Sequence, residues 1–110
     1  MDYGFAFLSA VDIHKDVVLA ERKGFTHAWL YDTQMICADV FQCLALCAAK
    51  TKKIKLGTNV TNPLSRIAPV TANNFATLNL LGQAHTWNAC GETRARGFMS
   101  RTARRADGAL

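Results

Sequence analysis

The chain has 110 residues, half of them hydrophobic, which suits one small globular unit with a modest core. It carries 13 Lys and Arg against 8 Asp and Glu, so the formal net charge is +5, and the pI is near 9.3. No apolar run approaches the roughly 18 residues that a membrane span requires, and the first residues lack a basic region followed by an apolar stretch. These features predict a cytoplasmic protein without a membrane partner.

The charge divides the chain into two parts. Residues 1–83 carry 8 basic and 6 acidic groups, a net charge of +2, whereas residues 84–110 carry 5 Arg and 2 acids, a net charge of +3. Arg, Ala, Gly, Thr and Ser dominate 92–110 with little periodicity, and this composition offers too little apolar area to offset chain entropy. The sequence therefore predicts one domain over 1–83 and a poorly structured basic tail over 84–110.

The cysteines indicate neither a disulfide framework nor a metal site. They are Cys37, Cys43, Cys47 and Cys90, none of which forms a CxxC pair, and no secretion signal accompanies them. Cys43 and Cys47 stand one helical turn apart in an Ala- and Leu-rich segment, where cysteine usually serves as a small buried hydrophobe. We expect no metal ligands among them.

An aromatic-rich run predicts a first strand over 4–8, followed by a helix. Asp12 is placed to cap this helix, and Gly24 is placed to end it. His14 has no partner at metal-ligand spacing, so we expect a solvated helix position. The predicted inner face carries Ile13, Val17 and Ala20, and the predicted solvent face carries His14, Lys15, Glu21 and Arg22.

A second strand is predicted over 27–31, and Asp32 stands at its carboxyl end. An acid at this place could bind a ligand or orient a neighbouring group, and it could equally cap a turn. Asp39 is placed to cap a second helix that runs to about Ala49. The apolar face of that helix carries Val40, Leu44, Cys47 and Ala48.

The third predicted strand, over 54–58, ends in a polar loop. Ile54 and Leu56 alternate at period two, and Gly57 permits close approach of the backbone. Asn62-Pro63 then forces an extended turn. Four small hydrogen-bonding side chains in this loop either make turn hydrogen bonds or contact a ligand: Thr58, Asn59, Thr61 and Asn62.

Pro69 is placed at the first position of a third helix, which runs to about Leu81. Its predicted inner face carries Ala72, Phe75, Ala76 and Leu78. Helical crossovers between successive strands require a parallel sheet with right-handed connections, so the fold class is α/β. A repeat of about 25 residues suits a (β/α) barrel of the TIM type, in which ligands bind at the carboxyl ends of the strands.

Segments of the chain resemble, in the same order, motifs of the luciferase-like flavin-dependent oxidoreductases. Residues 24–32 are similar to the family's GF-(D/T)-x-x-W-x-x-D element, and residues 54–63 resemble its I-x-LGTxVTNP strand and loop. Residues 66–73 and 76–79 are similar to the helix that follows. The match covers about 1–83. Several motifs at the right spacing identify a family specifically, whereas one motif alone would be weak evidence.

The resemblance implies a (β/α)8 barrel that binds FMN or a deazaflavin and acts on small organic substrates, as a monooxygenase or as another oxidoreductase. By position, it assigns Asp32 to the pocket floor and the flavin-facing wall to Gly57, Thr58, Asn59, Val60 and Thr61. Family members often have a cis peptide in this bulge, which here falls at Asn59-Val60. Many members follow the strand-two Asp with a His, whereas this chain has Thr33, and no catalytic residue is assigned.

Departures from the family pattern bear on activity. Three βα units cannot close an eight-stranded barrel, and the open sheet edge invites self-association. The phosphate site that such barrels build after later strands is missing from the pattern, so we expect this chain alone to bind flavin weakly or not at all and to be inactive. After Gly82 the sequence lacks the family's Gly-Arg pair and fourth strand, which suggests a truncated barrel with either a change of reading frame near 82–85 or a splice to unrelated sequence.

Two functions other than catalysis stay open. One is a non-catalytic interaction fragment that docks through its open sheet edge, which size-exclusion chromatography would distinguish from aggregation. The other is nucleic-acid binding by the tail, although no recognisable module is present and a solvated segment is the commoner role of such a composition. The Arg residues concerned are Arg94, Arg96, Arg101, Arg104 and Arg105.

Overall fold

The structure, a computed structural model of the chain, describes residues 1–62 and 64–81. The predicted tail over 84–110 and the proposed frame change near 82–85 lie outside the described residues. Strands and helices alternate along the described part, as the sequence predicted. The elements are β1 (Gly4–Phe7), α1 (Ile13–Arg22), β2 (His27–Leu30), α2 (Val40–Lys50), β3 (Lys55–Thr58) and α3 (Ala68–Leu81).

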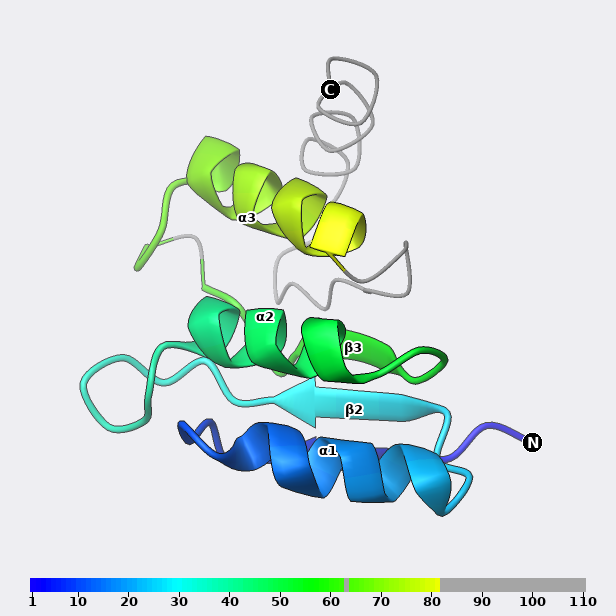
Figure 1. Cartoon of the computed structure of the whole chain (residues 1–110). Coiled ribbons are helices and arrows are strands. Elements are labelled where there is room, and N and C mark those ends of the chain that lie inside the picture. Colours follow the sequence, from blue (N-terminus) through cyan, green and yellow to red (C-terminus); the bar gives the residue numbers. More distant parts are fainter. Residues whose placement is uncertain (63, 82–110) are drawn as a thin grey trace.

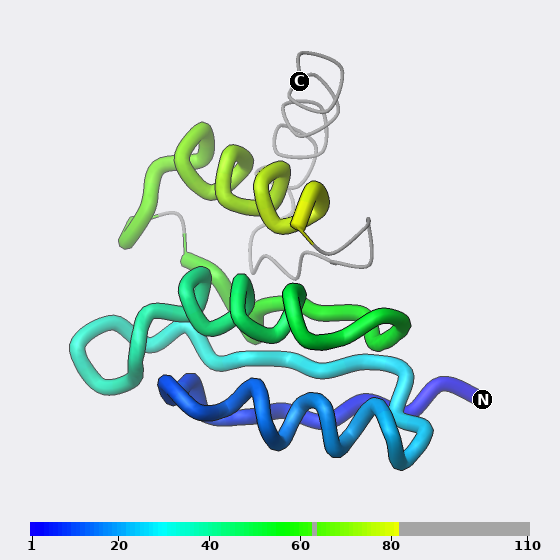
Figure 2. The backbone as a smooth tube through the Cα atoms, viewed as in Figure 1, coloured from blue at the N-terminus to red at the C-terminus, as the bar shows by residue number. Residues whose placement is uncertain are grey.

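The strands form a parallel sheet in the order β1-β2-β3, which confirms the predicted α/β topology. Phe7, Leu30 and Thr58 lie opposite one another at the carboxyl end of the sheet. Figures 1 and 2 show α1 and α2 side by side over one face of the sheet, with α3 next to α2. A row of helices along one face of a parallel sheet is the wall of a (β/α) barrel, so the described residues form an open arc of that fold.

The hydrophobic core lies between the sheet and its helices. Leu30, Leu44 and Leu56 are fully enclosed, and each such burial contributes about 1.5–3 kcal/mol. Phe41 and Phe75 meet edge to face, with ring centroids 5.2 Å apart, and join α2 to α3. The helix residues predicted to face inward are all buried: Ile13, Val17, Ala20, Val40, Leu44, Cys47, Ala48, Ala72, Phe75, Ala76 and Leu78.

Asp39 and Gly24 cap their helices as predicted, whereas Asp12 does not. The Asp39 Oδ1 atom accepts the backbone amides of Phe41 and Gln42 at 3.0 and 3.1 Å. Gly24 ends α1 with a φ of 91°, a conformation that glycine adopts without strain. Asp12 stands before α1 with φ −107° and ψ 6°, and its side chain makes no cap hydrogen bond. Asp12 thus occupies the predicted N-cap position, but its backbone is not the extended one that aims a capping oxygen at the free amides, so its side chain does not cap the helix.

Several predicted boundaries move by one residue. β1 and β2 end at Phe7 and Leu30, one residue early, and β3 begins at Lys55, one residue late. α3 begins at Ala68, so Pro69 is the second helical residue and not the first. Pro69 still lies in the first turn, where backbone amides have no partner inside the helix and a missing donor costs little.

The predicted solvent face of α1 is partly wrong, because Glu21 and His14 are half-buried. The Glu21 carboxylate accepts the backbone amides of Lys52, Lys53 and Ile54 at 3.0, 2.8 and 2.9 Å. It therefore ties the end of α1 to the turn before β3. The Nδ1 atom of His14 is enclosed and has no hydrogen-bond partner within the described part of the chain.

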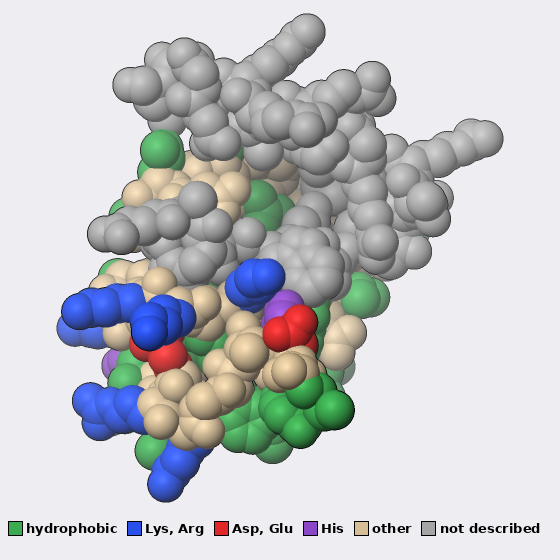
Figure 3. All heavy atoms as spheres, turned by 90° about the vertical axis from the view of Figure 1, so that its right-hand side faces the viewer, with side chains coloured by type: hydrophobic (Ala, Val, Ile, Leu, Met, Phe, Trp, Pro, Cys, Tyr) green, Lys and Arg blue, Asp and Glu red, His purple; other side chains and the backbone are tan. Residues whose placement is uncertain are grey.

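Basic side chains gather at the end of the molecule where the strands begin. Figure 3 shows this end, with Lys and Arg side chains clustered on it. The exposed basic residues of the helix ends and of the β3 start are Arg22, Lys23, Lys50, Lys52, Lys53 and Lys55. Most of the positive charge of the described residues therefore lies away from the carboxyl ends of the strands.

Candidate functional site

The carboxyl ends of the three strands meet at one edge of the sheet, and the β3–α3 loop starts there. The Tyr31 amide donates to the Phe7 carbonyl at 3.1 Å, and the Asn59 amide donates to the Leu30 carbonyl at 2.8 Å. These bonds continue the strand pairing one residue beyond each strand. The first loop residue after β3 is thus held beside the end of β2.

The segment 57–61, which holds the last two residues of β3 and the three residues after them, is anchored on both sides of an exposed tip, and we call it the 57–61 loop. Gly57, Thr58 and Thr61 are buried, and the Thr61 hydroxyl donates to Thr58 Oγ1 at 2.7 Å. Asn59 and Val60, between them, are exposed, and Val60 keeps 49% of its surface open to solvent. The Asn59-Val60 peptide is cis, as the family resemblance implied. The loop therefore presents Asn59 and Val60 from a fixed base.

A compact turn follows the loop. The Asn62 side chain accepts the Leu64 amide at 2.9 Å, and the Asn62 carbonyl accepts the Ser65 amide at 3.2 Å and the Ser65 hydroxyl at 2.9 Å. An asparagine that bonds its own backbone two residues ahead is a common turn former. The turn delivers the chain to Arg66, just before α3.

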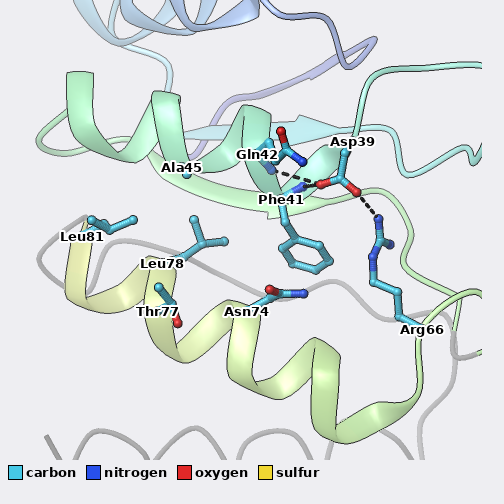
Figure 4. A pocket seen from close by; sticks show the side chains of 9 residues that line it. All are labelled: Asp39, Phe41, Gln42, Ala45, Arg66, Asn74, Thr77, Leu78 and Leu81. Atoms are coloured by element: carbon cyan, nitrogen blue, oxygen red, sulfur yellow. Dashed lines mark hydrogen bonds and ion pairs between the residues drawn. The ribbon is translucent and has the colours of Figure 1, made fainter.

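At the carboxyl end of the sheet, Arg66 links the segment just before α3 to the end of β2 and to the start of α2. Its Nη1 atom donates to Asp32 Oδ1 and Oδ2 at 2.9 and 2.7 Å, and its Nη2 atom donates to Asp39 Oδ2 at 2.8 Å. Its guanidinium carbon lies 4.8 Å from the centre of the Phe41 ring. Figure 4 shows the Asp39 carboxylate between the start of α2 and Arg66. We call Asp32, Asp39 and Arg66 the Arg66 cluster.

The two carboxylates of the cluster differ in exposure. The Asp32 side chain is 2% exposed and the Arg66 side chain 12%, whereas the Asp39 side chain is 39% exposed. Burial would raise the pKa of Asp39, but hydrogen bonds from Arg66 and from the α2 amides outweigh it, so that pKa lies below its usual value. Burial would likewise lower the pKa of Arg66, yet its two carboxylate partners raise it.

A groove of about 360 Å³ lies between α2 and α3, and Arg66 and Asp39 stand at one end of it (Figure 4). Its other lining residues are Phe41, Gln42, Ala45, Asn74, Thr77, Leu78 and Leu81. Because it lies between two helices of the outer layer, it is distinct from the sheet edge that carries the 57–61 loop. It brings together none of the sequence-predicted site residues.

Cys43 and Cys47 are buried in α2, which confirms their predicted role as small hydrophobes. Burial raises the pKa of Cys47 to about 12, and burial together with the Asp39 charge raises the pKa of Cys43. Within residues 1–62 and 64–81, no group of His, Cys, Asp and Glu is arranged to hold a metal ion. The same residues include no helix long and apolar enough to cross a membrane.

The structure places the sequence-predicted site residues at one edge of the sheet. Gly57 and Thr58 end β3, and Asn59, Val60 and Thr61 follow it. Asp32 lies just beyond the end of the neighbouring β2. Sequence reasoning missed Arg66, the partner of Asp32. A signal was present, since this Arg opens the last of the resembling motifs. Thr33 is exposed, at the position where many family members have a His.

A sequence model of the family described as luciferase-like monooxygenase matches residues 10–83. The 5,10-methylenetetrahydromethanopterin reductase of Methanolobus tindarius is 38% identical over 82 residues, which are 72% of this chain and 25% of that protein. The reductase of the same name from Methanopyrus kandleri is 41% identical over 63 residues, which are 57% of this chain and 18% of that protein. The chain thus spans about a quarter or less of the length of these relatives.

Solved structures share the fold. The coenzyme F420 dependent tetrahydromethanopterin reductase from Methanopyrus kandleri matches with a TM-score of 0.72 and 28% identity, over 90% of this chain and 30% of that chain. The oxygenating constituent of 3,6-diketocamphane monooxygenase from Pseudomonas putida, solved with FMN, has a TM-score of 0.71 at 13% identity, over 96% of this chain and 37% of that one. The second likeness concerns the fold alone. Because the family model covers well over half of its residues, the chain belongs to the luciferase-like monooxygenase family.

Proposed function

We propose that residues 1–81 supply the first three βα units of a deazaflavin- or FMN-dependent oxidoreductase, with the 57–61 loop against the cofactor ring. The observation that supports this most is the geometry of that loop. Buried, hydrogen-bonded threonines on either side fix the exposed Asn59 and Val60 at the carboxyl end of β3. In parallel α/β sheets, ligands bind beyond the carboxyl ends of the strands.

The surface at this edge suits a flat aromatic ring. One apolar side chain follows each strand and is open to solvent: Leu8 is 59% exposed, Tyr31 38% and Val60 49%. Asn59 adds an amide that can bond the polar edge of a ring. Ligand sites typically combine such an apolar lining with a few placed polar groups. The residues therefore fit the ring of the cofactor.

The described residues offer less to the cofactor's phosphate. Arg66 is the cation of the β3–α3 loop, and it is already paired with Asp32 and Asp39. Barrels of this type hold phosphate with loops that follow later strands. We therefore expect the 110-residue chain to bind FMN or a deazaflavin weakly, and to lack measurable oxidoreductase activity by itself.

A deazaflavin is favoured over FMN by the names of the relatives. The similar proteins at 34–41% identity are 5,10-methylenetetrahydromethanopterin reductases, and the solved relative at 28% identity is named for coenzyme F420. We propose a substrate of the same class, a small reduced pterin. When bound, a deazaflavin supplies hydride transfer. This chain's part is to support the ring through the 57–61 loop and to exclude water from one side of it.

A grafted enzyme tests this function. Residues 1–81 would replace the matching segment of the Methanolobus reductase, over which the two proteins are 38% identical. We expect the graft to bind F420 within about tenfold of the parent's affinity, a difference of about 1.4 kcal/mol. A graft that folds but binds more than about a hundredfold more weakly would refute the proposal.

A matched pair of variants locates the contact. Val60→Asp, at an exposed position of the loop tip, should weaken F420 binding to the graft by about tenfold or more, because it places a charge against an apolar ring. Leu19→Asp is the control, since Leu19 is 53% exposed on α1, away from the sheet edge. Equal effects of the two changes would show that the 57–61 loop does not face the cofactor.

The full chain by itself gives a second measurement. Titration with FMN and with F420, followed by fluorescence, should show no saturation at micromolar concentrations. A micromolar, 1:1 endpoint that Asn59→Ala abolishes would contradict the expected weak binding, while supporting the placement of the ring.

Self-association is a second candidate function, and the sheet edges favour it. In the described sheet β1 and β3 each pair on one side only, and Tyr3 and Phe5 of the β1 segment are 57% and 52% exposed. Unpaired edges with exposed aromatic side chains promote pairing between chains. A concentration-dependent dimer in size-exclusion chromatography, weakened by Phe5→Lys, would support it. Nucleic-acid binding by the 84–110 tail stays a prediction outside the described residues.

A further inference from the structure

The contacts of Asp32 argue against the role that its sequence position suggested. We propose that Asp32 and Arg66 form a positioning pair that holds the 57–61 loop in place, and that Asp32 does not itself contact the cofactor. This inference rests on the proposed function only for its link to the cofactor. The pair and its effect on the loop can be tested without any ligand.

The first step concerns how the loop is held. Its β3 side is anchored by the Asn59 amide on the Leu30 carbonyl and by the hydroxyl bond between Thr58 and Thr61. Beyond Thr61, Leu64 and Ser65 bond to Asn62 and stand just before Arg66. Among the described residues after the loop, Arg66 is the first whose side chain bonds to an element outside its own segment.

The second step concerns what Arg66 is fixed to. Asp32 follows β2 and lies 34 positions away in the sequence, and Asp39 caps α2 and lies 27 positions away. The Phe41 ring packs against the guanidinium at 4.8 Å. A planar fork with two acidic partners and an aromatic face is a geometry that arginine satisfies and lysine does not.

The third step concerns the capacity of Asp32 for other partners. Its Oδ1 atom accepts Arg66 Nη1 and Gln34 Nε2, each at 2.9 Å, and its Oδ2 atom accepts Arg66 at 2.7 Å. Only 2% of its side chain is exposed. A carboxylate that is enclosed and paired in this way has little surface left for a cofactor, whereas it fixes Arg66 firmly.

The experiment is a double-mutant cycle on the full chain, with Asp32→Asn, Arg66→Met and both together. The readout is hydrogen exchange of three amides whose bonds are known: that of Asn59 in the 57–61 loop, and those of Leu64 and Ser65 just after it. We call these three the loop amides. Their exchange is compared with that of Phe25 and Lys55, whose amides are bonded at the other end of the sheet. Arg22→Met and Asp12→Asn are matched controls, because both residues are exposed and Asp12 makes no cap bond.

We expect each single change to speed exchange of the loop amides by about tenfold relative to the reference amides, as for a local opening. In the double variant the effect should stay close to that of one change, because the two residues act through one contact. Unchanged loop exchange in Arg66→Met, or single effects that multiply in the double variant, would overturn the positioning pair. If Arg66→Met does not fold, Asp32→Asn and Arg66→Lys carry the test, with Arg66→Lys expected to lie between wild type and Asp32→Asn.

Cofactor binding to the grafted enzyme separates this inference from the proposed function. If Asp32 acts only as a positioning residue, Asp32→Asn should weaken F420 binding to the graft. In a graft that carries Arg66→Met, the same change should weaken F420 binding by no more than about a further twofold. A further loss of about tenfold in that background would mean that Asp32 contacts the cofactor directly, and would refute its role as a positioning residue. If the graft does not bind F420 but its loop amides still show coupled effects of the two changes on hydrogen exchange, the proposed function is refuted and the positioning pair stands.

Discussion

The two ends of the sheet are each tied by a carboxylate, but the ties differ in kind. At the amino end, Glu21 of α1 accepts three consecutive backbone amides of the turn before β3. At the carboxyl end, Asp32 accepts a side chain, that of Arg66, and leaves the backbone of 57–61 out of the contact. One tie takes up main-chain donors, and the other takes up the side-chain donors of an arginine.

This difference matches the roles of the two ends. A carboxylate that accepts several backbone amides fixes a turn whatever its side chains are, and Lys52 and Lys53 of that turn are exposed. A side-chain ion pair can instead hold a loop from one flank while its tip stays open. At the end that carries the candidate site, the 57–61 loop is therefore held indirectly, through the ion pair of Asp32 and Arg66 beside it.

The largest effect should come from removing the cation of the carboxyl end. Arg66→Met should lower the free energy of unfolding of the full chain by about 3 kcal/mol, because it leaves the Asp32 carboxylate buried without its counter-ion. Urea denaturation followed by circular dichroism measures this. The control Arg22→Met, at an exposed site, should change stability by no more than about 0.5 kcal/mol. A cost similar to that of the control would mean that the pair behaves like an exposed one.

The amino end should be affected next. Glu21→Ala should cost about 2 kcal/mol, since hydrogen bonds to a charged acceptor contribute about 1.5–3 kcal/mol and the freed amides can reach water. In the grafted enzyme the same change should leave F420 affinity within about twofold, because this end is far from the candidate site. Asp16→Ala, on the exposed side of α1, is the control for stability. A large loss of affinity in Glu21→Ala would show that the two ends are coupled.

A smaller effect is expected from the pH dependence of the α2 cap. The pKa of Asp39 is lowered in the folded chain, so its charge stabilises the fold above the unfolded pKa, and this contribution disappears as the pH falls through the folded value. Asn still caps a helix but carries no charge. The stability difference between wild type and Asp39→Asn should therefore be about 0.5–1 kcal/mol at pH 7 and shrink below about pH 4. A difference that grows in acid would contradict the lowered pKa.

The last prediction changes no residue and concerns the α2 layer between the two ends, where the rate of thiol modification reports on opening of the core. Cys37, in the loop after β2, is partly exposed, whereas Cys47 is enclosed and has a pKa of about 12. At pH 8 a thiol with that pKa is ionised to about one part in ten thousand. Iodoacetamide should therefore modify Cys37 at least about a hundredfold faster, as measured by mass spectrometry of peptides. Similar rates would mean that the core opens readily at the α2 layer.

The sequence by itself determined the elements of this fold. Alternating apolar runs and helical periodicity predicted the parallel order of β1, β2 and β3, and the inward faces of the helices were all correct. These signals are local, since they depend on residues within one or two turns of each other. The Asp39 cap and the Gly24 end were predictable for the same reason. Asp12 stands at the predicted N-cap position but makes no side-chain cap bond, because such a bond also needs a backbone conformation that the residue type does not impose.

The tertiary structure decided the partners of the charged side chains. Asp32 and Arg66 are 34 positions apart, and Glu21 lies more than 30 positions from the amides that it binds. No periodicity links such residues, because they meet only after the strands are paired in register. The family motifs therefore placed Asp32 at the right edge of the sheet, but only the packed chain shows that its carboxylate faces an arginine. The same packing half-buries Glu21 on a helix face that its polar pattern had assigned to solvent.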